Sequence, residues 1–228
     1  MRRKKYSIGL CAILLSFCLS GCFKKAPPAK TAFDQVIAII NAYNIESTNG
    51  YDYLIEQKVG DIIVNSDTIT CRVERGSTVK ASTDTVQKRL NNFGEEEQFS
   101  ETTFSSYFNN NQIGFKEQDG VINWVAGTSE EYFVIGIDKL DLSIGSFVSS
   151  MVNKSGNVYS LIGTLKTESL GTLFGINTVG MKNISIEIVV NIGTGKLMSL
   201  DISYSQSQSS TTISFSPFYD VVTVNFPS

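Results

Sequence analysis

The run Gly193-Thr194-Gly195-Lys196 is the part of the chain whose residue types come nearest to a phosphate-binding loop. A P-loop needs a glycine, four further residues and then Gly-Lys-Ser/Thr, and it opens a helix. Here Val190 stands at the first glycine position and Leu197 at the hydroxyl position, and the apolar residues after the loop recur every second residue. The sequence therefore predicts a hairpin turn between two strands, with the glycines supplying permissive backbone angles.

No other set of residues indicates catalysis or metal binding. The chain contains no histidine, which excludes Ser-His-Asp triads, Cys-His dyads and zinc sites of the Cys/His type. The run Glu95-Glu96-Glu97 is typical of a solvated turn, and a glycosidase pair at Glu130 and Glu131 would need a defined carboxyl separation and a pocket. Because no nucleophile motif is recognisable either, the sequence predicts a protein that is not an enzyme and uses no cofactor or metal.

The first 22 residues predict export and anchoring. A basic start at residues 2–5 precedes an apolar run at residues 8–19, which is shorter than the ~20 residues that cross a bilayer and is typical of a signal peptide. The next residues, Leu19-Ser20-Gly21-Cys22, resemble the lipobox of bacterial lipoproteins. That resemblance implies acylation of the Cys22 thiol, cleavage before it, and a lipid anchor (palmitate among its acyl chains) in the bacterial cell membrane. An ordinary signal peptide with a chance cysteine is the alternative.

Three segments follow from this interpretation: a signal peptide at residues 1–21, a lipidated cysteine and polar tether at 22–30, and one domain at 31–228. The whole chain has 19 Lys+Arg and 22 Asp+Glu; without the four cations of the signal, 15 stand against 22, a net charge of −7. An acidic exported domain is poorly suited to nucleic acid, since phosphate binding needs basic patches.

Cys71 is the one cysteine left for the folded domain, because Cys11 and Cys18 leave with the signal and Cys22 is lipidated. No disulfide within the chain is then expected. Cys71 alternates with polar neighbours in step with Ile69 and Val73. It should therefore be a small buried hydrophobe on the apolar side of a strand, not a reactive thiol.

The apolar spacing predicts a helix followed mainly by strands. Residues 31–44 have the three- and four-residue spacing of a helix, with Thr31 as a possible N-cap. Short helices are predicted near 143–151 and 168–175, as core-plugging elements. Alternation with a period of two predicts antiparallel strands with one apolar face, at residues 51–59, 69–74, 158–165, 184–192, 198–204 and 213–226, and more weakly over 78–125.

Three stretches carry a resemblance to a family: "VYSLIGT" at 158–164, "NIGTGKL" at 191–197 and the ending "FYDVVTVNFP" at 218–227. With the lipobox and the helix before the strands, they resemble the LppX/LprG lipoproteins and, more distantly, the LolA/LolB carriers, although Asn191 and Leu197 stand where that family commonly has aspartate and proline. The resemblance implies an α+β fold: a single antiparallel sheet of about eleven strands, curled into an open half-barrel. An N-terminal helix and short helices would cover its concave face, with acyl chains held between.

Two functions remain open from the sequence. The first is an extracytoplasmic, membrane-anchored monomer that binds or shuttles a lipid or lipoprotein. Its apolar cavity would be lined by Ile37, Ile40, Phe147, Val148, Met151, Leu173 and Phe174. Each of these could equally be an ordinary core residue. The second is a non-catalytic module for cell-envelope interaction or sensing, with a filled core. Its contacts would be exposed strand edges or the aromatics Tyr107 and Phe108.

Overall fold

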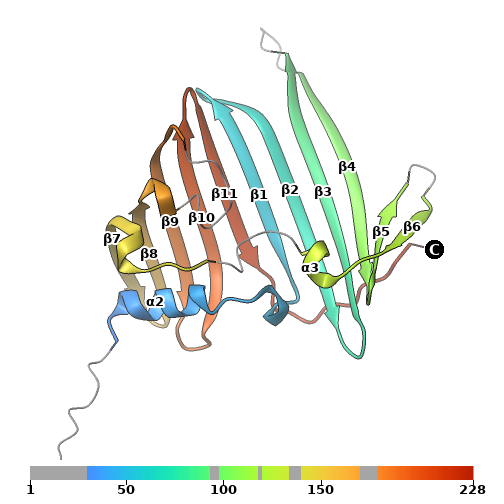
Figure 1. The fold of residues 1–228 in the computed structure, drawn as a ribbon, viewed down its shortest axis with the longest axis horizontal. Helices are drawn as coiled ribbons and strands as arrows, with labels where there is room; N and C mark the ends of the chain where they lie inside the picture. The colour runs from blue at the N-terminus through green and yellow to red at the C-terminus, as the bar shows by residue number, and fades with distance from the viewer. Residues whose placement is uncertain (1–29, 93–97, 118–119, 134–139, 170–178, 228) are drawn as a thin grey trace, which may run out of the picture. The chain divides into compact units, whose positions relative to one another are not determined.

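An antiparallel sheet of 11 strands, in the order β6-β5-β4-β3-β2-β1-β11-β10-β9-β8-β7, organises the chain from Thr31 onward (Figure 1). The computed structural model describes residues 30–92, 98–117, 120–133, 140–169 and 179–227. The strands are β1 (Gly50–Val59), β2 (Ile62–Arg75), β3 (Val79–Asn92), β4 (Gln98–Asn109), β5 (Gln112–Lys116), β6 (Ile122–Ala126), β7 (Phe147–Ser155), β8 (Val158–Leu165), β9 (Met181–Asn191), β10 (Lys196–Gln206) and β11 (Ser209–Pro217). Because β6 and β7 do not pair with each other, the sheet is open. The predicted α+β fold with one open sheet is confirmed.

The N-terminal helix α2 (Ala32–Asn41) forms where the helical spacing predicted it. Thr31 caps it: its hydroxyl accepts from the Asp34 N–H at 3.1 Å, and the Asp34 carboxylate accepts from the Thr31 N–H at 3.0 Å. Such a capping box satisfies two N–H groups that a helix start would otherwise leave unpaired. Its apolar stripe, which includes Ile37 and Ile40, is buried against β7–β10.

We call the face of the sheet that carries α2 the inner face. The second helix, α3 (Ser129–Tyr132), lies on this face too (Figure 1). It brings Tyr132 and Phe133 onto Phe108 of β4, with ring centroids 5.5 and 6.1 Å apart. Leu142 is bound to the end of α2: the Asn41 side chain donates to its carbonyl at 2.7 Å and accepts from its N–H at 2.9 Å. Two 3-10 turns, η1 (Ile45–Ser47) and η3 (Ile144–Ser146), also lie outside the strands.

The predicted helix near 143–151 is wrong beyond η3, because residues 147–155 form strand β7. Strands β7 and β8 are joined by the two-residue turn Gly156-Asn157, in which Gly156 has a φ of 58°. Gly-Asn between two apolar runs favours a hairpin, and Val148 and Val152 favour strand over helix. Of the helix predicted at 168–175, Glu168 and Ser169 lie in a helical stretch of residues 167–169, and the rest lies outside the described residues.

The C-terminal segment is also not the strand that its alternation predicted. Strand β11 ends at Pro217, which lacks an N–H for the ladder, and residues 218–227 cross the outer face of the sheet. The Arg72 guanidinium lies 4.4 Å from the Phe218 ring centroid, and the Glu74 carboxylate accepts from the Val224 N–H at 2.9 Å. Phe226 ends the crossing, packed in edge-on contacts beside β4 and β6. Tyr107 and Phe108, expected as exposed contacts, are buried at 6% and 2% exposure.

The N-terminal predictions remain predictions. The signal peptide of residues 1–21, the lipidated Cys22 and most of the 22–30 tether lie outside the described residues, as does the Glu95-Glu96-Glu97 run. Residues 31–228 form one compact unit in the structure. Among the described helices, none is both long and apolar enough to cross a membrane.

Cys71 lies in the core at 0% exposure, as the alternation predicted. Burial raises the pKa of its thiol from 9.0 to about 11, even though hydrogen bonds with Thr83 and Tyr51 act in the opposite direction. Thiolate, the nucleophilic form of cysteine, is therefore scarce at neutral pH in the folded chain. Burial also raises the pKa of Tyr53, on the neighbouring strand β1, to about 12.

We expect the fold to lose stability above pH 9. Between pH 9 and 11 the unfolded Cys71 thiol gives up its proton while the folded one keeps it, so its contribution is complete below pH 9 and is lost as the pH rises. Urea unfolding of residues 23–228 should show a fall in unfolding free energy from pH 7 to 10.5 that is about 1–2 kcal/mol larger than in Cys71→Ala. An equal fall in both proteins would contradict this. The thiol should also react with a disulfide reagent at pH 7.5 only once the chain is unfolded.

Candidate ligand-binding face

The predicted cavity residues divide into two groups. Ile37, Ile40 and Phe147 are buried at 9%, 1% and 7% exposure and belong to one hydrophobic cluster. The ring of Phe147 meets that of Phe33 edge-on, with centroids 5.5 Å apart. These three side chains pack as core between α2 and the sheet.

Val148 and Met151 are not brought together with them. They lie on the edge strand β7, at 69% and 57% exposure. A bulge at Phe147–Ser149 changes the register, and Met151 pairs with Ile162 while Val152 pairs with Leu161 of the core. Met151 therefore points to the outer face. Leu173 and Phe174 lie outside the described residues.

One row of cross-strand neighbours on the inner face extends beyond the cover of α2. From β7 to β4 the register aligns Val152, Leu161, Ile188, Leu200, Phe215, Tyr53, Ile69, Thr85 and Phe104. Exposure is 0–1% from Leu161 to Phe215, whereas Tyr53 and Ile69 are partly exposed and Phe104 reaches 46%. We call Tyr53, Ile55, Ile69 and Phe104 the apolar band. Tyr53, Ile69 and Phe104 belong to the more accessible end of this row, with the buried Thr85 between Ile69 and Phe104, and Ile55 lies in the next row on β1.

In the next two rows along the strands, the inner-face side chains change from apolar to polar near β1 and β2. One row aligns Ser150, Gly163, Ile186, Ile202, Ile213, Ile55, Asp67, Gln87 and Thr102, and the following row aligns Gln57, Asn65, Arg89 and Ser100. Ile55 is thus the direct neighbour of Asp67. We call Gln57, Asn65, Asp67, Gln87 and Arg89 the polar cluster. Its members share the inner face with Ile69 and Cys71, because every second residue of a strand points to the same side.

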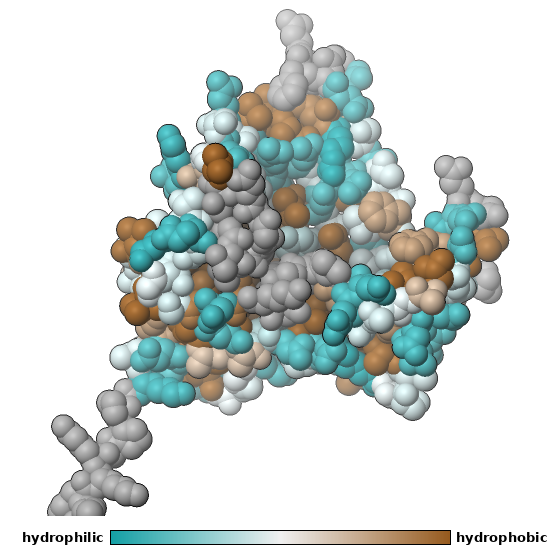
Figure 2. Space-filling model, in the orientation of Figure 1, coloured by the Kyte–Doolittle hydropathy of each residue, from teal (hydrophilic) through white to brown (hydrophobic). Residues whose placement is uncertain are grey.

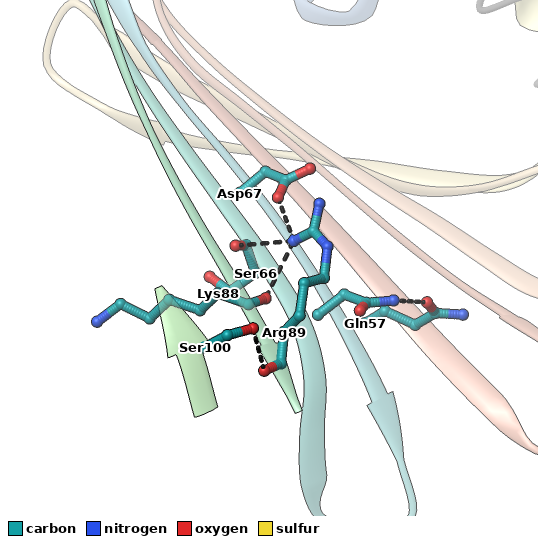
Figure 3. A network of polar contacts seen from close by, with 7 residues as sticks. Gln57, Ser66, Asp67, Lys88, Arg89 and Ser100 are labelled. Carbon is teal, nitrogen blue, oxygen red and sulfur yellow. Dashed lines mark hydrogen bonds and ion pairs between the residues drawn. The ribbon is translucent and has the colours of Figure 1, made fainter. Parts of the chain in front are cut away.

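Side-chain bonds join four members of the polar cluster in two pairs, Arg89 with Asp67 and Asn65 with Gln57 (Figure 3). The Arg89 guanidinium donates to the Asp67 carboxylate and to the carbonyls of Ser66 and Lys88, at 3.3 and 3.0 Å for the two carbonyls. The bond to Asp67 raises the pKa of Arg89. Beside this pair the Asn65 amide donates to the Gln57 side-chain oxygen at 2.7 Å. The two charges of the cluster are opposite, so it offers hydrogen-bonding groups without a net charge.

The inner face is therefore amphipathic within the reach of a single small molecule. Hydrophobic and hydrophilic side chains alternate in patches on the face that carries α2 and α3 (Figure 2). The apolar band can bury hydrocarbon, and the polar cluster can bind hydroxyl, amide or zwitterionic groups. Among the described residues no group of three or more Cys, Asp and Glu could hold a metal ion.

The first two amides of the Gly193–Lys196 turn are already bonded within the turn. It joins β9 to β10, and Lys196 pairs with Asn191 across it, so the predicted hairpin is confirmed. The Asn191 side-chain oxygen already accepts from the N–H groups of Gly193 and Thr194, at 3.0 and 3.2 Å. A hollow of about 340 Å³ adjoins the turn, lined by Asn191, Thr194, Lys196, Leu197, Met198, Pro217 and Tyr219. In it the Lys196 ammonium lies 4.3 Å from the Tyr219 ring centroid.

The carboxylates near α3 have a structural role. The Glu131 carboxylate accepts from the Thr128 N–H at 2.7 Å and completes a capping box at the start of this helix. Such a bond commits the side chain to helix initiation.

The polar cluster was not predicted from the sequence, although the sequence contains part of the signal for it. Asn65 and Asp67 continue the odd-numbered series of Ile69, Cys71 and Val73 along one strand, so alternation alone places them on the same side. What alternation cannot supply is the register that brings Arg89 of β3 and Gln57 of β1 to the same height.

No protein-family model matches the chain, and no curated protein matches it. Among solved structures it is similar to LprF from Mycobacterium bovis, at 11% identity and a TM-score of 0.44, over 85% of this chain and 95% of that one. It is also similar to the hypothetical protein CT021 from Chlamydia trachomatis, at 9% identity and a TM-score of 0.32, over 85% and 96% of the two chains. Both likenesses extend over most of each chain.

Proposed function

We propose that this chain is an exported lipoprotein, anchored at the extracytoplasmic face of a bacterial membrane through Cys22, which binds an acyl-chain-bearing amphiphile on its inner face. The role is non-catalytic. The observation that carries the proposal is the boundary between the apolar band and the polar cluster, where Ile55 and Asp67 lie side by side. An amphiphile likewise has an apolar chain next to a polar head group.

The dimensions of the band suit an acyl chain. From β1 to β4 the row of Tyr53, Ile69, Thr85 and Phe104 crosses three strand spacings, roughly 14 Å. Each CH₂ group fully removed from water contributes about 0.8 kcal/mol, so half-burial of ten groups contributes about 4 kcal/mol before ordering costs. Such binding needs no charge on the protein, which agrees with the internal pairing of Arg89 and Asp67.

This location differs from the cavity that the sequence predicted beneath α2. There Leu161 and Ile188 have 0% exposure, and Ile37 and Ile40 pack in the same cluster. The packing between α2 and the sheet favours a filled core in that half. Acyl binding is therefore proposed for the half of the inner face that lies over β1–β4.

The first measurement is native mass spectrometry of residues 23–228, purified without detergent and followed by organic extraction. We expect co-purifying mass in the range of acyl lipids, or uptake of added lipid by the bare chain. A clean mass with no uptake of added lipid would remove the binding proposal and leave an anchored interaction module with a filled core.

A charge placed in the apolar band should weaken binding. Phe104→Glu puts a carboxylate at a 46%-exposed site on the inner face, and we expect the Kd for a fluorescent 16-carbon fatty acid to rise about tenfold, the equivalent of about 1.4 kcal/mol. The matched control is Thr103→Glu, which adds the same charge one residue away on the outer face and should leave the Kd unchanged. Equal effects of both variants, at equal urea midpoints, would show that the inner face is not the site.

A further inference from the structure

Exposed apolar side chains continue the inner face beyond the apolar band. On β5 the side chain of Phe115 is 53% exposed, and on β6 that of Val125 is 46% exposed. Phe108 of β4, on which α3 packs, pairs with Ile113, and Ile113 pairs with Val125. Val125 therefore points to the inner face, and so does Phe115, which lies two residues from Ile113 on the same strand. Figure 2 shows hydrophobic side chains gathered over the part of this face where Figure 1 places β5 and β6.

Phe104, Phe115 and Val125 form a diagonal series across β4, β5 and β6. Phe115 pairs with Ser106, which is two residues from Phe104 on β4. It also pairs with Asn123, which is two residues from Val125 on β6. Diagonal neighbours lie about 7–8 Å apart, within reach of aromatic side chains. We call Phe115 and Val125 the apolar extension, because they continue the apolar band from its member Phe104.

Apolar side chains predominate around the apolar extension. The inner-face residues of this region are Phe104, Ser106, Phe108, Ile113, Phe115, Asn123 and Val125. Two of these seven, Ser106 and Asn123, are polar, and the Tyr132 hydroxyl of α3 donates to the Ser106 carbonyl at 2.9 Å. Helix α3 buries Phe108 at 2% exposure and leaves Phe104 at 46%. A contiguous exposed apolar patch of this kind is typical of a binding surface.

The length of the combined surface sets the size of the chain that fits it. From β4 to β6 the apolar extension adds two strand spacings, roughly 10 Å, to the roughly 14 Å of the apolar band. If the band accommodates about ten CH₂ groups, the two together accommodate about 17 in the same proportion. The polar cluster lies on β1–β3 beside Ile55, at the opposite end of this line from Val125.

We propose that the apolar extension binds the distal part of a long acyl chain, so that Phe115 and Val125 select chains of about 16 carbons over chains of about 10. The inference rests on the proposed function, since the polar cluster must hold the head group for the tail to reach β6. Half-burial of six further CH₂ groups strengthens binding about fiftyfold. A ligand with a shorter chain ends near Phe104 and gains nothing from the extension.

Removal of an aromatic ring from the apolar extension should weaken the binding of long chains alone. We would measure the Kd of decanoic acid and of hexadecanoic acid for residues 23–228 by isothermal titration calorimetry. We expect Phe115→Ser to raise the Kd of hexadecanoic acid about fivefold, and Phe115→Ser with Val125→Ser to raise it about twentyfold. The Kd of decanoic acid should stay unchanged in both variants, because its chain ends before β5.

Phe99→Ser is the matched control. Phe99 has a similar exposure of 45% and lies on the outer face of β4, one residue from the inner-face Ser100, so both Kd values should stay unchanged. If Phe104→Glu weakens the binding of both acids while Phe115→Ser weakens neither, or weakens both equally, acyl binding stands and the role of the extension is overturned. If the native chain binds neither acid, the proposed function fails and this inference fails with it.

The position of the chain end provides a second measurement. Hexadecanoic acid with a photoreactive diazirine at its last carbon should label strands β5 and β6, as mapped by mass spectrometry of the digested protein. Decanoic acid with the same group should label β4 around Phe104. Labelling of the same strand by both acids would overturn the proposal.

Discussion

The burial of one largely apolar face of an open sheet is the constraint on which the rest of the structure depends. Each strand directs every second side chain inward, and the register aligns these side chains into rows that cross from β7 to β4. A closed barrel would bury such rows within itself, but an open sheet must cover them with other elements. Helix α2 covers β7–β10 and helix α3 packs on Phe108 of β4, while Tyr53 and Ile69 between them stay partly exposed.

Because the sheet is open, it has two edges, β6 and β7, and the segments near these edges differ. Residues 218–227 cross the outer face from β11 toward β6 and are held by Arg72, Glu74 and the aromatic pair of Tyr107 and Trp124 with Phe226. The Phe226 ring of this segment contacts Trp124 of β6, with centroids 5.4 Å apart. The other edge of the sheet is β7, which carries a bulge and Lys154. Bulges and edge lysines are among the features that keep an open edge from pairing with another chain.

Local patterns in the sequence predicted the elements that depend on a few neighbouring residues. Thr31 and Asp34 marked the start of α2, and the period of two after Lys196 separated a hairpin turn from a phosphate loop. The apolar residues at 147, 148 and 151 fitted the spacing of a helix, whereas the β-branched Val148 and Val152, the Gly156-Asn157 turn and pairing with β8 favour the strand. The exposure of Met151 follows from a one-residue bulge, and no periodicity in the sequence reveals it. The polar cluster depended on the register of β1, β2 and β3, which residues far apart in the chain determine together.

The pairing of Arg89 with Asp67 bears on what kind of amphiphile the inner face would select. A lone guanidinium beside an apolar band would favour an anionic head group strongly, because charge-assisted hydrogen bonds are about twice as strong as neutral ones. Here Asp67 already accepts from it, so an incoming anion would have to compete with a carboxylate that is fixed in place. The gain for an anionic head over a neutral or zwitterionic one is then small. Affinity would come mainly from hydrocarbon burial along Tyr53, Ile69 and Phe104, and the polar cluster would orient the ligand.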